Sequence, residues 1–407
     1  MTSSSAPEAA PKPPWRVVWA LSVTQIVGWG TIYYGIALLM PPIEAELGWS
    51  RDAVSLAYAL GLLVAGFAAL PVGLVIDRLG GRGAMTLGSV LGGLLFALLG
   101  QVESYPAFVA IWLGLGVAMA LVLYEAAFIV ITMAFGSEYR KGITVCTFAG
   151  GLASSIFWPI TDALLAQAGW RDTALVLGLA NVLICGPLHF FALPGARAVK
   201  TEATAPAPAG AVEPKTTLAE LTRLRSFWLL ALSFTAYGFV ASALSVHQIP
   251  MLRELGVEDR AAVVFASLVG VMQVVGRLIE FFFAKRFTAA QVGLAMTALM
   301  PAAMLVLWFA GTNGLMLFLY VTAYGVANGI ITIVRGAIPV ELYGRSGYGA
   351  ISGALSAPSV LARALGPWVA ALVWTSFGGY AAVILTLFGI GLVGFLAFAG
   401  AVGGQRS

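Results

Sequence analysis

Five ionisable side chains stand inside long apolar runs of the sequence: Glu125, Arg277, Glu280, Arg335 and Arg363. An unpaired charge inside a lipid bilayer costs at least about 2.5–3.5 kcal/mol, so ionisable residues at such positions are candidates for function. A guanidinium offers a planar fork of N–H donors that fits a carboxylate, and a carboxyl group can take up and release a proton. These residue types therefore predict reversible binding of an anion and of a proton.

The first predicted anion site centres on Arg277. Gln273 lies four residues before it and Glu280 three residues after it, so in a helix the three side chains share one face. We interpret Arg277 as the anion anchor and Gln273 as a neutral second contact. The alternative is a local Arg277–Glu280 ion pair that only neutralises itself.

A second predicted constellation joins Glu125, in the apolar run 105–134, to Arg335, in the run 313–339. We expect the two to pair across a cavity in one conformational state. Protonation of Glu125, or an anion bound at Arg335, would then loosen the pair. The alternative is a permanent structural pair, and Glu280 remains a second candidate for carrying the proton.

The remaining polar candidates are each open to a functional and a structural interpretation. Arg363 can be a second anion contact, or it can satisfy carbonyl groups freed by two nearby prolines. His247 can sense pH, or it can be a satisfied histidine at a helix end. Tyr33, Tyr324 and Asn328 can line a cavity and bind a small molecule, or they can pack between helices.

Composition excludes most other classes of protein. Of 407 residues, 60% are hydrophobic and 10% are charged, with a mean hydropathy of +0.94, whereas a soluble domain has roughly 25% charged residues. The net charge of +4 is too small to indicate nucleic-acid binding. Two cysteines and two histidines form no metal-binding pattern, and no phosphate-binding loop or catalytic set appears. We therefore expect no cofactor, no metal and no enzymatic activity.

A membrane-spanning helix needs roughly 20 apolar residues. The sequence contains twelve such runs, which predict an all-α integral membrane protein: 15–41, 52–76, 83–102, 105–134, 142–167, 171–193, 226–250, 260–284, 288–310, 313–339, 346–375 and 378–402. The long polar interruption divides them into two pseudo-symmetric six-helix bundles, 15–193 and 226–402. Between the bundles we place a cytoplasmic linker, 194–225, and at the ends a disordered N-terminus, 1–14, and a tail, 403–407.

Lysine and arginine set the expected orientation. With the N-terminus in the cytoplasm, fifteen of the 22 lie on the cytoplasmic side, four on the opposite side and three within spans. Positively charged loops favour the cytoplasm. We therefore expect a multi-pass protein of the inner membrane, with both termini cytoplasmic.

The two halves read as repeats offset by about 209 residues. Pro41 and Pro250 are expected to end the first span of each half, the pairs Leu47-Gly48 and Leu255-Gly256 precede the second, and Gly169 and Gly378 precede the last. Parallel repeats place a binding site at their interface and allow it to face either side of the membrane in turn.

The turn between the second and third spans carries Gly73, Asp77, Arg78, Gly80 and Arg82. Its pattern Gly-x-x-x-Asp-Arg-x-Gly-x-Arg resembles the signature of the major facilitator superfamily. The resemblance implies that Gly73 lets the spans 52–76 and 346–375 approach closely. It also implies that Asp77, Arg78 and Arg82 form a cytoplasmic ion network. An ordinary charged turn is the alternative.

A narrower resemblance is to the monocarboxylate transporter and oxalate:formate antiporter families. It rests on Leu47-Gly48-Trp49-Ser50-Arg51, His247-Gln248-Ile249-Pro250 and Gly276-Arg277. In those families an arginine at the position of Arg277 binds the substrate carboxylate, and oxalate:formate antiporters carry a cation near the position of Arg363. The monocarboxylate transporters of animals have an aspartate one helical turn before that arginine, where this sequence has Gln273.

These resemblances imply a secondary transporter that works as a single chain in the bilayer. It would move a small organic anion, a monocarboxylate, by proton symport and alternating access. Anion exchange is a close variant. A rival is a proton-driven exporter of hydrophobic or cationic compounds, in which Glu125 faces the cavity unpaired and Arg277 faces away. A membrane sensor without transport is a third possibility.

Overall fold

The computed structural model describes residues 15–135, 139–195, 222–283, 286–343 and 348–403, and the regular elements within them are helices. The predictions for 1–14, for most of the linker and for 404–407 fall outside these residues. The first bundle comprises α1 (Trp15–Gly28), η1 (Trp29–Tyr33), α2 (Ile36–Leu47), α3 (Arg51–Leu79), α4 (Gly81–Leu99), α5 (Tyr105–Val122), α6 (Tyr124–Phe135), α7 (Tyr139–Gly151), α8 (Ala153–Ala180), η3 (Asn181–Cys185) and α9 (Gly186–Ala192).

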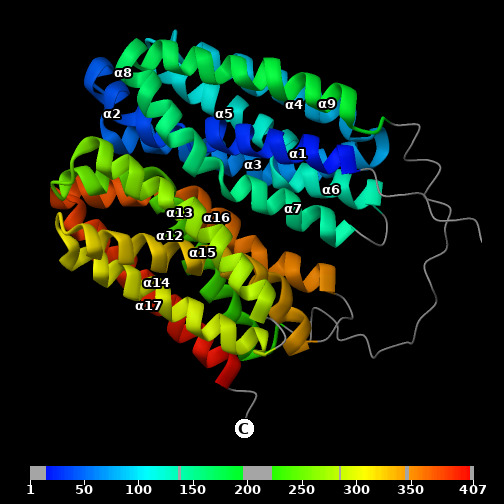
Figure 1. The fold of residues 1–407 in the computed structure, drawn as a ribbon, viewed down its shortest axis with the longest axis vertical. Coiled ribbons are helices and arrows are strands. Elements are labelled where there is room, and N and C mark those ends of the chain that lie inside the picture. The colour runs from blue at the N-terminus through cyan, green and yellow to red at the C-terminus, as the bar shows by residue number, and fades with distance from the viewer. Residues whose placement is uncertain (1–14, 136–138, 196–221, 284–285, 344–347, 404–407) are drawn as a thin grey trace, which may run out of the picture.

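The second bundle has longer and less interrupted helices. It comprises α12 (Arg225–Glu254), α13 (Asp259–Phe283), α14 (Ala289–Ala310), α15 (Gly314–Tyr343), α16 (Tyr348–Phe377) and α17 (Tyr380–Gly403). The two bundles lie beside each other in Figure 1.

Eleven helical segments in the described residues are long and apolar enough to cross a membrane. One of them, Lys141–Ala192, has 52 residues, which as a straight helix would be about 78 Å long against a hydrocarbon core of about 30 Å. It turns at Gly169, whose backbone is not helical (φ 72°, ψ 176°). The segment therefore covers the predicted spans 142–167 and 171–193 as far as Ala192, so each of the twelve predicted spans corresponds to helix among the described residues.

The first transmembrane segment of each half ends at a glycine. The expectation that Pro41 and Pro250 end these segments is wrong. Pro41 and Pro250 lie inside α2 and α12, which continue to Leu47 and Glu254. The chain turns only at Gly48 and Gly256, where φ is 68° and 87°. Glycine adopts this left-handed conformation without the strain that a Cβ atom brings, so it commonly follows the end of a helix.

Two irregular segments lie next to each other in the first bundle. The π-helical turn η1 follows α1, and the predicted span 105–134 breaks at Leu123, which has an extended backbone (φ −81°, ψ −166°). Gln25 joins them, because its amide donates to the Val122 carbonyl (2.7 Å) and accepts from the Trp29 indole (3.1 Å). The side chain thus satisfies a carbonyl at the end of α5 that has no helical partner. π-Helical turns frequently occur at functional sites.

The bundles touch mainly through α3 with α16 and α8 with α13. They also meet at the end of the molecule formed by Gly48, Arg51, Gly256 and Tyr380, which we call the Arg51 end. There the Arg51 guanidinium donates to the Tyr380 hydroxyl (3.3 Å), and Arg253 of α12 pairs with Asp162 of α8 (3.5 Å). At the opposite end, where α9 ends and α12 begins (the linker end), the helices of the two bundles diverge (Figure 1).

The glycine at the α3–α16 contact is Gly66, not Gly73. A side chain at Gly66 would collide with Val360 of α16, whereas one at Gly73 would meet Ile129 of α6, 3.3 Å away. Helices α3 and α16 therefore approach closely as expected, but two turns from the predicted position.

Part of the expected ion network lies outside the described side chains, namely those of Asp77 and Arg78. The Arg82 guanidinium donates to the Leu193 carbonyl (2.9 Å), which ties the start of α4 to the end of α9. Gly80 lies between α3 and α4 with φ 81°.

Candidate functional site

A cavity of about 190 Å³ lies between the two bundles. The predicted anion-contact residues come from η1, α13, α15 and α16, and the structure places them all in its lining: Tyr33, Gln273, Arg277, Tyr324, Asn328 and Arg363. Arg335 of α15 lines it too, although the sequence analysis assigned it to proton coupling.

The charge of this cavity has one sign. Arg277, Arg335 and Arg363 reach it from three helices of the second bundle, and no aspartate or glutamate is among its described lining residues. A cleft lined by charges of one sign raises the local concentration of ions of the opposite sign. The arrangement therefore suits an anion.

Arg277 bridges the two bundles. Its side chain is 7% exposed, and its Nη1 donates to the Thr147 carbonyl of α7 in the first bundle (2.6 Å). Its Nε makes a longer contact with the Gly329 carbonyl of α15 (3.4 Å). Gly151 leaves room for the guanidinium, since a Cβ there would lie 2.9 Å from Nη1. Thr147 lies near the C-terminal end of α7, where the helix dipole favours a cation.

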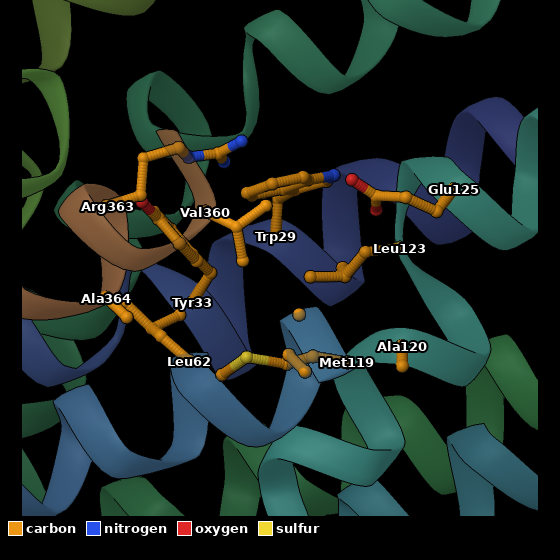
Figure 2. A pocket seen from close by; sticks show the side chains of 12 residues that line it. Trp29, Tyr33, Leu62, Met119, Ala120, Leu123, Glu125, Val360, Arg363 and Ala364 are labelled. Carbon is orange, nitrogen blue, oxygen red and sulfur yellow. The ribbon is translucent and has the colours of Figure 1, made fainter. Parts of the chain in front are cut away.

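Arg335 and Arg363 lie within electrostatic range of each other and of Glu125. The guanidinium carbon of Arg335 is 5.5 Å from the ring centre of Phe234, a cation–π contact. Arg363 interacts with the hydroxyl of Tyr33 in the opposite bundle, and its guanidinium points toward Trp29 in Figure 2.

Sequence reasoning missed several aromatic residues of the cavity. Trp29 and Tyr33 stack edge to face with ring centres 4.7 Å apart, and the ring of Tyr124 lies 5.0 Å from Trp29. Tyr237 of α12 donates to the Asn328 side chain (2.7 Å) and fixes its orientation. Only the spacing could have indicated Trp29, because it lies one helical turn before Tyr33, which the sequence analysis named as a candidate.

Glu125 lies beside the central cavity, not in its lining. It lines a smaller pocket of about 90 Å³ together with Trp29, Tyr33 and Arg363. Trp29 lies between Glu125 and Arg363 in Figure 2. Among the described side chains no ion pair joins Glu125 to Arg335, so the pair expected for one conformational state is absent from this one.

Glu280 does not line the cavity that Arg277 lines, so the expectation that the two act on one face is wrong. Arg277 faces the central cavity, whereas Glu280 lines a different pocket between α13, α14 and α15, with Ile279, Phe287 and Gln291. A local Arg277–Glu280 pair is absent from the described side chains. Positions three apart on a helix are separated by about 60° around its axis. Two long side chains at such positions can therefore bend into different pockets.

His247 is fully buried at the Arg51 end. Its Nε2 lies 2.8 Å from the Pro367 carbonyl of α16, and its Nδ1 lies 2.8 Å from the Tyr380 hydroxyl. A carbonyl can only accept, so Nε2 carries the proton and Nδ1 accepts from Tyr380. These contacts match the structural interpretation of a satisfied histidine.

Comparison with known proteins identifies the family. The model of the Major Facilitator Superfamily matches residues 20–332, more than half of the chain. The protein belongs to the Major Facilitator Superfamily. As a member it is a multi-pass membrane transporter of small molecules.

Three curated superfamily relatives are similar in sequence. The oxalate:formate antiporter of Oxalobacter formigenes is 25% identical over 55% of this chain and 52% of its own length. A probable L-galactonate transporter of Escherichia coli is 27% identical over 35% of this chain and 31% of its own. The multidrug efflux protein YfmO of Bacillus subtilis is 28% identical over 35% of this chain and 38% of its own length. The matches thus span about half or less of each relative.

Solved structures of superfamily members share the fold. The nucleoside transporter NupG (D323A mutant) superimposes with a TM-score of 0.76 at 15% identity, covering 95% of this chain and 99% of that one. A bacterial homologue of the lysosomal transporter Spinster, in an inward-facing and occupied conformation, gives 0.71 at 15% identity over 98% of both chains.

Proposed function

We propose that this transporter moves a small organic anion, a monocarboxylate, across the inner membrane together with a proton by alternating access. The observation that carries the proposal is the convergence of Arg277, Arg335 and Arg363 on one cavity between the bundles, with no acidic residue in its described lining. Three positive charges that converge on one cavity attract anions, and a bound anion lowers the cost of holding like charges close together.

Arg277 would link anion binding to movement of the bundles. In this conformation its Nη1 donates to a carbonyl of the opposite bundle, at Thr147. A substrate carboxylate competes for the same N–H group and forms a stronger, charge-assisted bond. Anion binding would therefore release one of the contacts that hold α13 to α7, which gives the two bundles freedom to rock.

Glu125 would carry the proton. It lies in electrostatic range of Arg335 and Arg363, both of which line the anion cavity. Its ionised form competes with a substrate anion for the field of these arginines. Protonation removes that competition, so proton and anion would bind together, as symport requires.

The orientation follows from charge. The linker end carries the excess of lysine and arginine and would face the cytoplasm. Because the bundles join at the Arg51 end and diverge at the linker end, the cavity would be accessible from the cytoplasm in this conformation.

The rival exporter of hydrophobic or cationic compounds has one supporting observation, since Glu125 lacks an ion pair among the described side chains. Its other expectation fails, because Arg277 lines the cavity and does not face away. Anion exchange fits the cavity as well as symport does, and the oxalate:formate antiporter is a relative with that activity in its name.

The test is uptake of radiolabelled monocarboxylates into proteoliposomes, with and without an inward proton gradient. We expect uptake stimulated by the gradient, and a loss of at least tenfold in Arg277→Ala, since a lost charged hydrogen bond costs about 1.5–3 kcal/mol. Arg277→Lys keeps the positive charge but not the two parallel N–H donors of the guanidinium, so it should recover only part of the uptake. Arg260→Gln is the control, because Arg260 is exposed at the Arg51 end, away from the cavity.

Glu125→Gln separates the proton from the anion. We expect the variant to transport anions by exchange without stimulation by the gradient. Unchanged gradient stimulation would refute the role of Glu125. If no carboxylate is taken up by the wild type, the anion proposal fails and the exporter becomes the better interpretation.

A further inference from the structure

The pocket that contains Glu125 adjoins the central cavity, yet its lining is of a different kind. The two spaces share Trp29, Tyr33 and Arg363. Beyond these three and Glu125, the smaller pocket is lined by apolar side chains and one glycine, from α3, α5, the break at Leu123 and α16: Leu62, Ala65, Gly66, Met119, Ala120, Leu123, Val360 and Ala364. We call this space the side chamber (Figure 2).

The side chamber has the size of a short hydrocarbon tail. Its volume is about 90 Å³, whereas an apolar cavity of about 150 Å³ binds benzene, which has six carbon atoms. Away from Tyr33, Glu125 and Arg363 its walls are apolar and offer a water molecule few hydrogen-bond partners, so an apolar group gains by filling that part of the chamber. About three carbon atoms in a chain or a small branch would fit.

The walls of the side chamber are held in place. The Trp29 indole is fixed by its hydrogen bond to Gln25, which is itself bound to the Val122 carbonyl. On another side α3 lies directly against α16, where Gly66 meets Val360. Met119 and Ala120 are buried, at 2% and 4% exposure. A chamber with fixed walls can discriminate by the length of what enters it.

We propose that the side chamber binds the apolar tail of the transported monocarboxylate, with its carboxylate held in the central cavity by the arginines. Arg363 faces both spaces and marks the junction of head and tail. The inference rests on the proposed function, and it narrows the substrate class to carboxylates with a tail of about three carbons beyond the head group.

Glu125 adds a charge criterion. It lies at the rim of the side chamber, with Trp29 between it and Arg363 (Figure 2). A tail that ended in a second carboxylate would bring two like charges together while Glu125 is ionised. With Glu125 protonated, that carboxylate would still have to leave water for walls that are mostly apolar, which is costly. The chamber therefore selects monocarboxylates over dicarboxylates of the same length.

Two substitutions change the chamber in opposite directions. Ala120→Leu adds three carbons inside it, and Met119→Ala removes most of one wall. The matched control is Ala110→Leu, which makes the same change on the exposed surface of the same helix, α5. A variant that merely folds poorly would weaken all acids alike, whereas the two chamber variants should move the preferred length in opposite directions.

The experiment measures competition with radiolabelled lactate uptake in proteoliposomes by unlabelled 2-hydroxy acids of increasing chain length. In the wild type we expect half-inhibition to improve about fourfold per added methylene until the chamber is full, and then to worsen. Ala120→Leu should shift the optimum to shorter acids and Met119→Ala to longer ones, while Ala110→Leu should keep the wild-type optimum. The dicarboxylic acid of the preferred length should compete at least about tenfold more weakly.

The outcomes separate the two proposals. If lactate is transported but its competitors show no dependence on length, or if Ala120→Leu weakens all acids equally, the side chamber does not bind the tail and the anion proposal stands. If the wild type takes up no carboxylate, the proposed function fails and the chamber inference fails with it.

Discussion

Arg51 is the side chain that most directly joins the two bundles at the Arg51 end, and its replacement by glutamine should open that end. Within its own bundle Arg51 pairs with Glu44 (3.2 Å). Across the interface its guanidinium carbon lies 3.9 Å from the ring centre of Trp374, and its Nη1 donates to Tyr380. The glutamine variant loses the interactions with both aromatic residues.

The magnitude follows from these two contacts. A hydrogen bond from a charged donor contributes about 1.5–3 kcal/mol, and the 3.3 Å separation puts this one at the low end. A cation–π contact at a partly exposed site adds about 0.5–1 kcal/mol. The sum, about 2 kcal/mol, changes the equilibrium between closed and open forms about 30-fold. An open form populated at about 1% in the wild type would rise to roughly a quarter of the molecules.

The assay is a distance distribution from double electron–electron resonance. Spin labels replace Gln101 and Thr312, which are exposed at the Arg51 end of the first and second bundles, after the buried Cys146 and Cys185 are changed to serine. We expect Arg51→Gln to add a second population at longer distance.

Arg171→Gln is the matched control. Arg171 pairs with Glu46 (2.9 Å) and donates to the Gly100 carbonyl at the same end of the molecule, but these contacts stay within the first bundle. The distance distribution of this variant should match the wild type. An unchanged distribution in Arg51→Gln, or the same shift in both variants, would refute the assignment of Arg51 as the contact that closes this end.

Two further predictions concern local geometry. Gly151→Ala should displace the Arg277 guanidinium and raise the half-saturation constant for anion uptake about tenfold with little change in melting temperature, whereas Gly83→Ala, which meets no neighbour, should change neither. Equal uptake kinetics in the two variants would contradict the first claim. Backbone amides of Arg260 and Ala261 bind the Glu258 carboxylate at the start of α13 and lower its pKa. Glu258→Gln should therefore melt at a lower temperature near pH 7, and the difference should fade as the pH falls through the lowered pKa of the wild-type carboxylate, where that side chain is protonated too. A difference that stays the same size at all acidic pH values would contradict the second claim.

Much of the fold could be predicted because lipid imposes a simple rule on the sequence. Each span must be apolar over its length and satisfy its own backbone, so hydropathy alone locates the helices. It cannot locate the breaks within them. Leu123 and the π-helical turn at Trp29 both lie inside continuous apolar runs, and the Gln25 side chain that stabilises both acts across 97 residues of sequence.

The residues of the candidate site could likewise be predicted from the sequence only in part. Charged residues inside spans stand out, and the structure places Arg277, Arg335 and Arg363 in one cavity. The position of Glu280 could not be read in this way, because it depends on which side of α13 faces α14. The role of Gly66 was equally hidden, since a glycine in an apolar run gives no sign of which helix it meets.

The repeats show why the bundles would move as rigid bodies. In the first bundle the Glu46 carboxylate accepts from the Trp170 indole (2.6 Å), and in the second the Glu254 carboxylate accepts from the Trp374 indole (2.7 Å). Each contact stays within its own bundle and ties the end of the first transmembrane segment to the turn before the last one, at Gly169 or Gly378. Arg51 differs, because its partners lie in both bundles.

A rocking motion that exposes the cavity at the Arg51 end can therefore leave both glutamate–tryptophan contacts intact, but it must break the contacts of Arg51 with Trp374 and Tyr380. Because Tyr380 also donates to His247 of α12, those contacts reach the helix that carries Tyr237 and Ser245 into the anion cavity. Closure at the Arg51 end and the shape of the central cavity thus depend on one helix, α12, and this shared helix would give the proposed alternating access a physical path through the protein.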